Sequence, residues 1–334
     1  ALNQPPSLTS TNLSTPPSHK IDVNFSAFDI DLASLSELKG VLNNLVATIG
    51  RGCGRLYAPW EQILKAKADR KAALEYAEKE IDLVRKASEL ADQVSELSKK
   101  LQQPSNDILI RSFSRLIDDM HRKQSNRESV VSEMINSMST RPPKQDTNLN
   151  IDLDWVDNFF DIAENIGNDE VRAFWGEILA KEIAAPNSIN RQTLHVLRST
   201  SPNIAQRFTH FCRASIKFEG KCFFIHPNVY PFQQGGSLDE FEINLDDLLD
   251  FESAGLIRSV ETFMVSHGVV EGKFDEIDLG GKMAEVKWAG IQAHTIFFTN
   301  SGKEIRNALP LEPLKTYADA LISAYSDKLA FRWK

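Results

Sequence analysis

Residues 168–186 constrain the fold of this chain more than any other stretch, because both ends and the buried face of one helix can be recognised there. Asn168 is of a type that caps the first turn of a helix, and Pro186 prevents a helix from continuing. Between them, apolar side chains recur at the spacing of a helix that packs against a core. These side chains are Val171, Phe174, Trp175, Ile178, Leu179 and Ile183. The pattern predicts a central, buried helix.

Two acidic residues on this helix are candidates for a catalytic carboxylate pair. Glu177 and Glu182 are five positions apart, which places them about 140° apart around a helix. Two carboxylates that act on one substrate must lie on the same face. We therefore expect Glu177 and Glu182 to be solvated residues at the rim of the buried face.

The neighbouring segments complete a helical bundle over residues 150–216. Trp155 and Phe159 lie on one face of a preceding helix, which Gly167 ends. Ser201 followed by Pro202 is typical of an N-cap and the first helical position of a further helix. Four helices with short connections predict a compact bundle.

Length and composition indicate a folded protein of several units. The chain has 334 residues, of which 42% are hydrophobic and 25% charged, and these are ordinary globular values. A formal net charge of -8 argues against an overall attraction to nucleic acid or to anionic membranes. We expect neither a signal peptide nor a membrane span, because residues 1–20 lack an apolar core and no apolar run reaches 18 residues. With only three cysteines, we expect a cytoplasmic protein.

Residues 1–140 are expected to precede the bundle as a tail and an arm. Residues 1–33 predict a flexible tail or an extended arm, because the first twenty are rich in Pro, Ser and Thr. Residues 34–140 predict a helical arm, in which a break at Pro104 and Ser105 is followed by two separate helices. Before that break, apolar residues repeat at spacings of 4, 3, 4, 3 and 4, at Leu83, Ala87, Leu90, Val94, Leu97 and Leu101. This heptad seam predicts a coiled coil, either as a dimer or as an antiparallel hairpin within one chain.

The pattern changes at residue 217 to short β-like runs separated by turns that contain glycine. The runs are KCFFIHP, VETFMVSHGVV, KMAEVKW and AHTIFF. Between them lies a helix whose apolar positions are Leu245, Leu248, Leu249 and Phe251. The fold class predicted for the chain is mainly α, with an α+β domain at residues 217–334.

Two segments of this last domain resemble a known fold. LLDFESAGLI and FFTNSGKEIRNAL are similar to the second half of a winged-helix domain, over roughly residues 240–310. The resemblance implies a helix that closes with Gly-Leu-Ile, a two-stranded wing, and a closing helix after a Thr-x-x-Gly-Lys-Glu turn.

A longer part of the chain, from about residue 50 to residue 309, resembles an uncharacterised family of bacterial proteins, a domain of unknown function. The residues that carry this resemblance are LYAPWEQILKAKADRKA, FWGEILAKEIAAPNSINRQTLHVL, AGLI and FFTNSGKEI. It implies an architecture and a bacterial origin, without a known activity.

Winged helices often place a helix in the major groove of DNA. Here residues 239–252 contain seven Asp and Glu residues and no Lys or Arg, so this helix would repel phosphate. The candidates for nucleic-acid binding therefore lie elsewhere, at Lys99, Lys100, Arg111, Arg115, Arg122 and Lys123.

Cys212, Cys222 and His226, together with His210, are candidate metal ligands, since zinc accepts mixed sets of sulfur and nitrogen ligands. Nine residues separate the two cysteines, however, whereas zinc fingers have two to four there. His210 and Cys212 would also point about 200° apart on a helix. We therefore expect two buried thiols, no bound metal and no cofactor.

The motifs GxxxxGK, HExxH and GxSxG do not occur in the sequence. The sequence predicts a non-enzymatic interaction or regulatory protein, which oligomerises through its helical arm and binds a protein partner through the acidic wing. Two alternatives are a nucleic-acid-binding regulator of winged-helix type and an enzyme of unrecognised class, whose site is assembled from distant residues.

Overall fold

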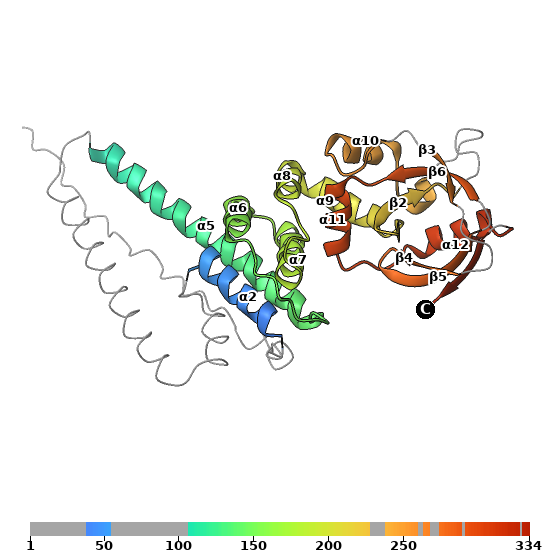
Figure 1. Ribbon diagram of the computed structural model, residues 1–334. Coiled ribbons are helices and arrows are strands. Elements are labelled where there is room, and N and C mark those ends of the chain that lie inside the picture. The colour runs from blue at the N-terminus through green and yellow to red at the C-terminus, as the bar shows by residue number, and fades with distance from the viewer. Residues whose placement is uncertain are drawn as a thin grey trace, which may run out of the picture. The chain divides into compact units, whose positions relative to one another are not determined.

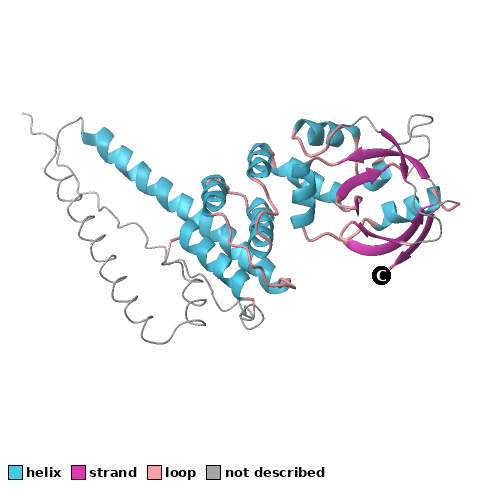
Figure 2. Cartoon of the chain, in the orientation of Figure 1, coloured by secondary structure: helices cyan, strands magenta, loops and turns pink. Residues whose placement is uncertain are grey.

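A computed structural model describes residues 38–54, 106–227, 238–259, 263–267, 274–288, 291–327 and 329–334 (Figure 1). The predicted tail at residues 1–33 and the heptad seam at residues 83–101, with Lys99 and Lys100, lie outside the described residues. The described residues form a helical part, from α2 to α9, and a later part that contains a β sheet (Figure 2).

The helical part is organised around α7. Its elements are α2 (Lys39–Gly52), α5 (Asn106–Thr140), α6 (Leu153–Ala163), α7 (Asp169–Ala184), α8 (Arg191–Ser199) and α9 (Pro202–Cys212). α7 packs along the second half of α5 and also contacts α2 and α9. Gly176 permits the close approach of α5, because a Cβ atom at this position would lie 2.7 Å from the Cβ atom of Glu133 and 2.8 Å from the backbone nitrogen of Met134.

The ends of α7 confirm the prediction, whereas its buried face differs from it. The Asn168 side chain caps the helix by accepting a hydrogen bond of 3.1 Å from the backbone N–H of Val171. Trp175, Ile178, Leu179 and Ile183 are buried, but Phe174 is only half-buried. Ser201 and Pro202 begin α9 as predicted, and the Ser201 hydroxyl accepts a hydrogen bond from the N–H of Ile204.

The prediction that Glu182 is solvated at a rim is wrong, because this side chain is 1% exposed. Its carboxylate accepts hydrogen bonds from the N–H of Asn187 at 2.6 Å, the N–H of Ile189 at 2.8 Å and the Ser188 hydroxyl at 3.1 Å. Burial raises the pKa of Glu182, and these hydrogen bonds act in the opposite direction. The loop after α7 folds back onto the helix and supplies the donors that make a buried carboxylate tolerable.

The prediction of two separate helices after residue 105 is also wrong. α5 runs without interruption from Asn106 to Thr140, because neither proline nor glycine occurs in this range. Its second half supplies the buried side chains Val130, Val131, Met134, Ile135 and Met138. Its first half extends beyond this contact (Figure 1).

The later part of the chain contains a seven-stranded sheet with the order β3-β6-β2-β1-β4-β5-β7, in which each pair is antiparallel. The strands are β1 (Ile216–Phe218), β2 (Lys221–Ile225), β3 (Phe263–His267), β4 (Asp275–Leu279), β5 (Lys282–Trp288), β6 (Ile291–Phe297) and β7 (Leu329–Trp333). A 3₁₀ turn, η2 (Asp239–Phe241), precedes the helix α10 (Leu245–Ser253), and two helices, α11 (Asn300–Ala308) and α12 (Lys315–Ala324), come after β6.

Aromatic side chains fill the core beside this sheet. Phe211 of α9 stacks on Phe298 at a ring distance of 5.4 Å and lies 5.2 Å from Phe224 of β2. Tyr317 of α12 stacks on Phe224, and its hydroxyl bonds both the N–H and the carbonyl oxygen of Ile225. The predicted fold class, α+β and mainly α, is confirmed. The sheet is larger than a two-stranded wing, since β1, β2, β4, β5 and β7 pair beside β3 and β6.

Candidate interaction surfaces

The first half of α5 exposes a group of large apolar side chains. The exposed fraction is 54% for Leu116, 51% for Ile117 and 62% for both Ile108 and Met120. We call these four residues the α5 stripe. On the second half of the same helix, the corresponding apolar residues are almost completely buried. Large exposed apolar surfaces on a helix mark contacts with other protein segments.

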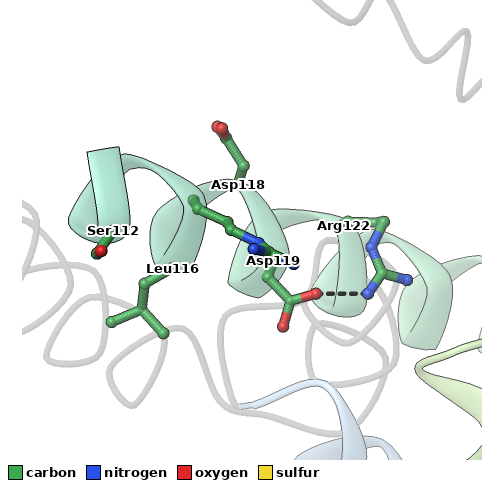
Figure 3. Close-up of a pocket in the computed structure, with 6 residues that line it drawn as sticks. Ser112, Leu116, Asp118, Asp119 and Arg122 are labelled. Atoms are coloured by element: carbon green, nitrogen blue, oxygen red, sulfur yellow. Dashed lines mark hydrogen bonds and ion pairs between the residues drawn. The ribbon is translucent and has the colours of Figure 1, made fainter. Parts of the chain in front are cut away.

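A hollow of about 590 Å³ lies beside this part of α5 (Figure 3). The described residues that line it are Ser112, Arg115, Leu116, Asp118, Asp119 and Arg122. All six come from one helix, and Figure 3 shows Asp119 turned toward Arg122 while Asp118 points away from this pair. Small-molecule sites are usually enclosed by several elements, so the described part of this hollow is a helix surface and does not form a pocket.

Half of the described candidates for nucleic-acid binding are already engaged by acidic side chains. Arg122 pairs with Asp119 at 2.5 Å, and Lys123 lies 3.1 Å from Glu164 and 3.4 Å from Asp119. Hydrogen bonding to Glu164 and then to Asp119 raises the pKa of Lys123. Arg111 and Arg115 are exposed, and neither forms an ion pair with another described residue. Of the four described candidates, Arg111 and Arg115 therefore remain available for contact with phosphate.

α10 presents a second exposed apolar face, formed by two of the four apolar positions that the sequence gives to this helix. Leu248 and Phe251 are buried, but Leu245 is 64% exposed and Leu249 is 46% exposed. These two leucines are one helical turn apart and so are neighbours on the surface of α10. The three buried side chains Asp247, Leu248 and Phe251 mark the opposite face. We call Leu245, Asp246, Leu249 and Asp250 the α10 surface.

Some of the acidic residues around α10 form ion pairs with described residues, and others do not. Asp247 is buried, forms a capping box with Asn244, and pairs with Arg207, whose guanidinium also lies 2.6 Å from Asp250. In the described part of the chain, no ion pair involves Glu240, Glu242 or Asp246. Asp246, next to the exposed Leu245, is therefore a carboxylate without an ion pair to another described residue.

The structure describes all four candidate metal ligands, His210, Cys212, Cys222 and His226. The Nε2 atom of His210 forms a hydrogen bond of 2.7 Å with the carbonyl oxygen of Phe241, which accepts it. Cys212 and Cys222 are free and buried, and burial raises the pKa of both thiols, while His226 is also buried. Among the described residues, no three His, Cys, Asp or Glu side chains are grouped so that they could hold a metal ion.

A groove of about 360 Å³ lies between α7 and α9. Phe174, half-buried on α7, lines it together with Pro202 of α9 and Pro310. The carboxylates at its rim have partners, since Glu177 accepts a hydrogen bond from Ser137 at 2.8 Å and Glu170 bonds Gln206. The groove is apolar, and its carboxylates are held in place by hydrogen bonds.

The fold and these surfaces define a mainly helical α+β protein with exposed apolar helix faces. A family model described as Protein of unknown function (DUF2806) matches residues 110–322, and the chain belongs to this family. The match extends from the exposed half of α5 into α12. No curated protein and no solved structure matches the chain. None of the described helices is both long enough and apolar enough to cross a membrane.

Proposed function

We propose that this protein is a non-enzymatic interaction protein that binds a protein partner through the α10 surface. The observation that carries the proposal is the exposure of Leu245 and Leu249 beside Asp246. Exposed leucines one turn apart provide apolar contact area for a partner, and the neighbouring carboxylates provide specificity for a segment with complementary charge. A partner segment that combines apolar and basic side chains would match both features.

The charge of this surface supports a protein partner over DNA. Binding to DNA is dominated by contacts of Lys and Arg with phosphate, and acidic residues oppose it. Arg207 is the basic residue that pairs with α10, and it is already bound to Asp247 and Asp250. The alternative function, a nucleic-acid-binding regulator, depends on Lys99 and Lys100, which lie outside the described residues, and on the basic residues of α5. Of these, Arg111 and Arg115 form no ion pair with another described residue.

We further propose that α10, β3, β6 and α11 form a winged-helix-like unit adapted to protein binding. In support, β3 and β6 pair antiparallel, with Val265 opposite Ala293. Thr299 caps α11 by accepting a hydrogen bond of 3.0 Å from the N–H of Gly302. Gly302 is required for close packing, because a Cβ atom there would lie 2.0 Å from the carbonyl oxygen of Leu256. A cytoplasmic location is part of the same proposal.

The partner can be tested with the full chain as bait in a lysate of the native host. We compare wild type with the double variant Leu245→Ser, Leu249→Ser by quantitative mass spectrometry. The expected result is at least one protein that wild type retains and the variant loses, followed by direct binding of that purified protein. Because both leucines are exposed, the variant should unfold at the same denaturant concentration as wild type.

Leu153→Ser is a matched control, since Leu153 is an exposed leucine on α6, with 44% of its surface accessible. This control should retain the partner. Equal retention by wild type and the α10 double variant of every captured protein would remove the basis for the proposal. Retention of the protein on DNA that falls steeply as salt rises, and that Arg111→Gln with Arg115→Gln abolishes, would favour the nucleic-acid alternative instead.

The same proposal gives the protein a coiled-coil arm, formed by the heptad seam at residues 83–101 and by the first half of α5. The support is the exposure of Leu116 and Met120, whereas the apolar residues on the second half of α5 are buried among the described residues. Coiled coils bury such residues against a second helix with the same repeat.

A further inference from the structure

The α5 stripe has no apolar cover among the described residues, although the chain continues directly from its start. Leu116 and Met120 are more than half exposed, and α5 begins at Asn106. The residues that precede Asn106 contain the heptad seam, which ends at Leu101. The heptad seam therefore ends only four residues before α5, the helix that exposes Leu116 and Met120.

The two seams are mirror images of each other about Ser105. Going backward from Ser105, the seam occupies positions 4, 8, 11 and 15 residues away, at Leu101, Leu97, Val94 and Leu90. Going forward by the same four intervals, the sequence has Leu109, Phe113, Leu116 and Met120. All eight positions are large and apolar. Of these eight residues, the structure describes the side chains of Leu116 and Met120, and both are exposed.

Mirror symmetry in sequence is what an antiparallel helical hairpin requires. Residues at equal distances from the turn lie at the same height along the two helices, because each helix rises about 1.5 Å per residue. Each mirrored pair would therefore form one layer of the hairpin core. Residues 102–105 leave a connection of four residues, and hairpins of two helices are typically joined by two to five residues. Pro104 within this connection prevents one continuous helix.

The mirrored apolar pairs end after Met120, where α5 begins to pack against other helices. The next mirrored positions bring Ala87 opposite Lys123 and Leu83 opposite Arg127. Lys123 and Arg127 are both paired with Glu164, at 3.1 Å and 2.5 Å. From this point α5 packs against its neighbours in the helical part, beginning with the buried residue Asn126. The apolar layers therefore stop where α5 gains partners of its own.

We infer that residues 83–101 of the same chain cover Leu116 and Met120 of the α5 stripe, as the second helix of an antiparallel coiled coil with Val94 against Leu116 and Leu90 against Met120. This inference rests on the coiled-coil arm of the proposed function and adds its partner and its register. Pairing within the chain is favoured over pairing with a second copy, because the short connection keeps the two seams at a high effective concentration. The hairpin would occupy the seam that could otherwise join two copies.

Paired cysteines in the full chain test the register. The variants are Val94→Cys with Leu116→Cys, and Leu90→Cys with Met120→Cys, each oxidised under mild conditions. Facing positions of a coiled coil lie within the distance of about 7 Å that a disulfide allows between Cα atoms. We expect each pair to lose two free thiols per chain in a denaturing titration, without a dimer band on a non-reducing gel. Peptide mapping should find the two new cysteines joined to each other and the three native ones free.

Leu101→Cys with Leu116→Cys is the control for register, because these positions would be offset by seven residues, or about 10 Å. This pair should keep all its thiols. A disulfide between two chains at the facing positions would overturn the inference and assign the seam to a second copy. Absence of any disulfide in both facing pairs would overturn it as well.

Hydrogen exchange of the unmodified protein provides a second test, which does not depend on the folding of any variant. Amides in residues 83–101 and in residues 106–122 should both exchange slowly, because both would belong to one cooperative unit. Leu116→Glu should speed exchange in both segments together while leaving residues 169–184 unchanged. Fast exchange throughout residues 83–101 in wild type would contradict the inference. Loss of partner binding at α10 is a separate measurement, so the two proposals can fail independently.

Discussion

Arg306 of α11 and Asp278 of β4 form a bidentate ion pair inside the protein. The Nη1 atom of Arg306 lies 2.8 Å from Oδ2 of Asp278, and Nη2 lies 2.6 Å from Oδ1. The Nε atom donates to the Ser215 hydroxyl at 3.0 Å, and the arginine side chain is 2% exposed. These contacts hold α11 against the sheet next to the start of β1.

Replacing Arg306 with Leu should destabilise the protein strongly. The change would leave the Asp278 carboxylate largely buried without its cation, and breaking such a pair costs about 3–5 kcal/mol. The free energy of unfolding from urea titrations measures this loss. Arg51→Leu is a suitable control, because Arg51 makes the same forked contact with Asp157 at the surface, where solvent screens the pair. A similar loss in both variants would contradict a special role for the buried pair.

The Arg306–Asp278 pair should also make stability depend on pH. Burial disfavours ionised Asp278, but the hydrogen bonds and the charge of Arg306 outweigh burial and lower the pKa of this carboxyl below its ordinary value. A lowered pKa means that the stabilisation is present above the unfolded value, about 3.9, and is lost as the pH falls through the folded value. The difference in unfolding free energy between wild type and Asp278→Asn should therefore be constant near neutral pH and shrink below about pH 4.

Gly176→Ala should destabilise the contact between α5 and α7. The added Cβ atom would meet the backbone nitrogen of Met134 at 2.8 Å, and a backbone cannot move aside as a side chain can. Overpacking of this kind costs about 1–3 kcal/mol. Gly167→Ala is the matched control, since a Cβ atom there would have no neighbour within 4 Å. Thermal unfolding of the two variants should differ, with the loss confined to Gly176→Ala.

The three thiols should be unreactive in the folded protein. Cys53, Cys212 and Cys222 are free and buried, and burial raises the pKa of each of them, which lowers the fraction of reactive thiolate. A chromogenic disulfide reagent near pH 8 should modify them slowly in buffer and rapidly in concentrated urea. Rapid modification of one thiol in buffer would show that its surroundings open locally.

Local features of the helices could be predicted because they depend on residues close in sequence. Asn168 and Ser201 cap their helices through hydrogen bonds to residues three positions away, and Pro202 occupies the first turn of α9. Such contacts form within a single turn whatever the rest of the chain does. The prediction of an uncharacterised protein family was confirmed by the family model that matches residues 110–322.

Contacts between distant segments could not be predicted from the sequence in the same way. Asn44 is 2% exposed, and its side chain bonds the carbonyl oxygen of Leu149 at 3.0 Å and the N–H of Ile151 at 2.9 Å. Nothing in the sequence near Asn44 distinguishes it from a surface amide. The solvent exposure of Leu245 and Leu249 could not be predicted either. Periodicity gives the apolar positions of a helix, but it does not show which of them a neighbouring element covers.

The sequence by itself thus determined both ends of α7 and the start of α9, the mainly helical α+β class, and the mirror relation of the two seams about Ser105. The tertiary structure decided that α5 is one continuous helix with an exposed first half, that Glu182 is buried and that the α10 surface is exposed. The physical reason is that turns and caps are settled by neighbouring residues. Burial of a side chain depends on which segments, distant in the sequence, pack against it in the folded protein.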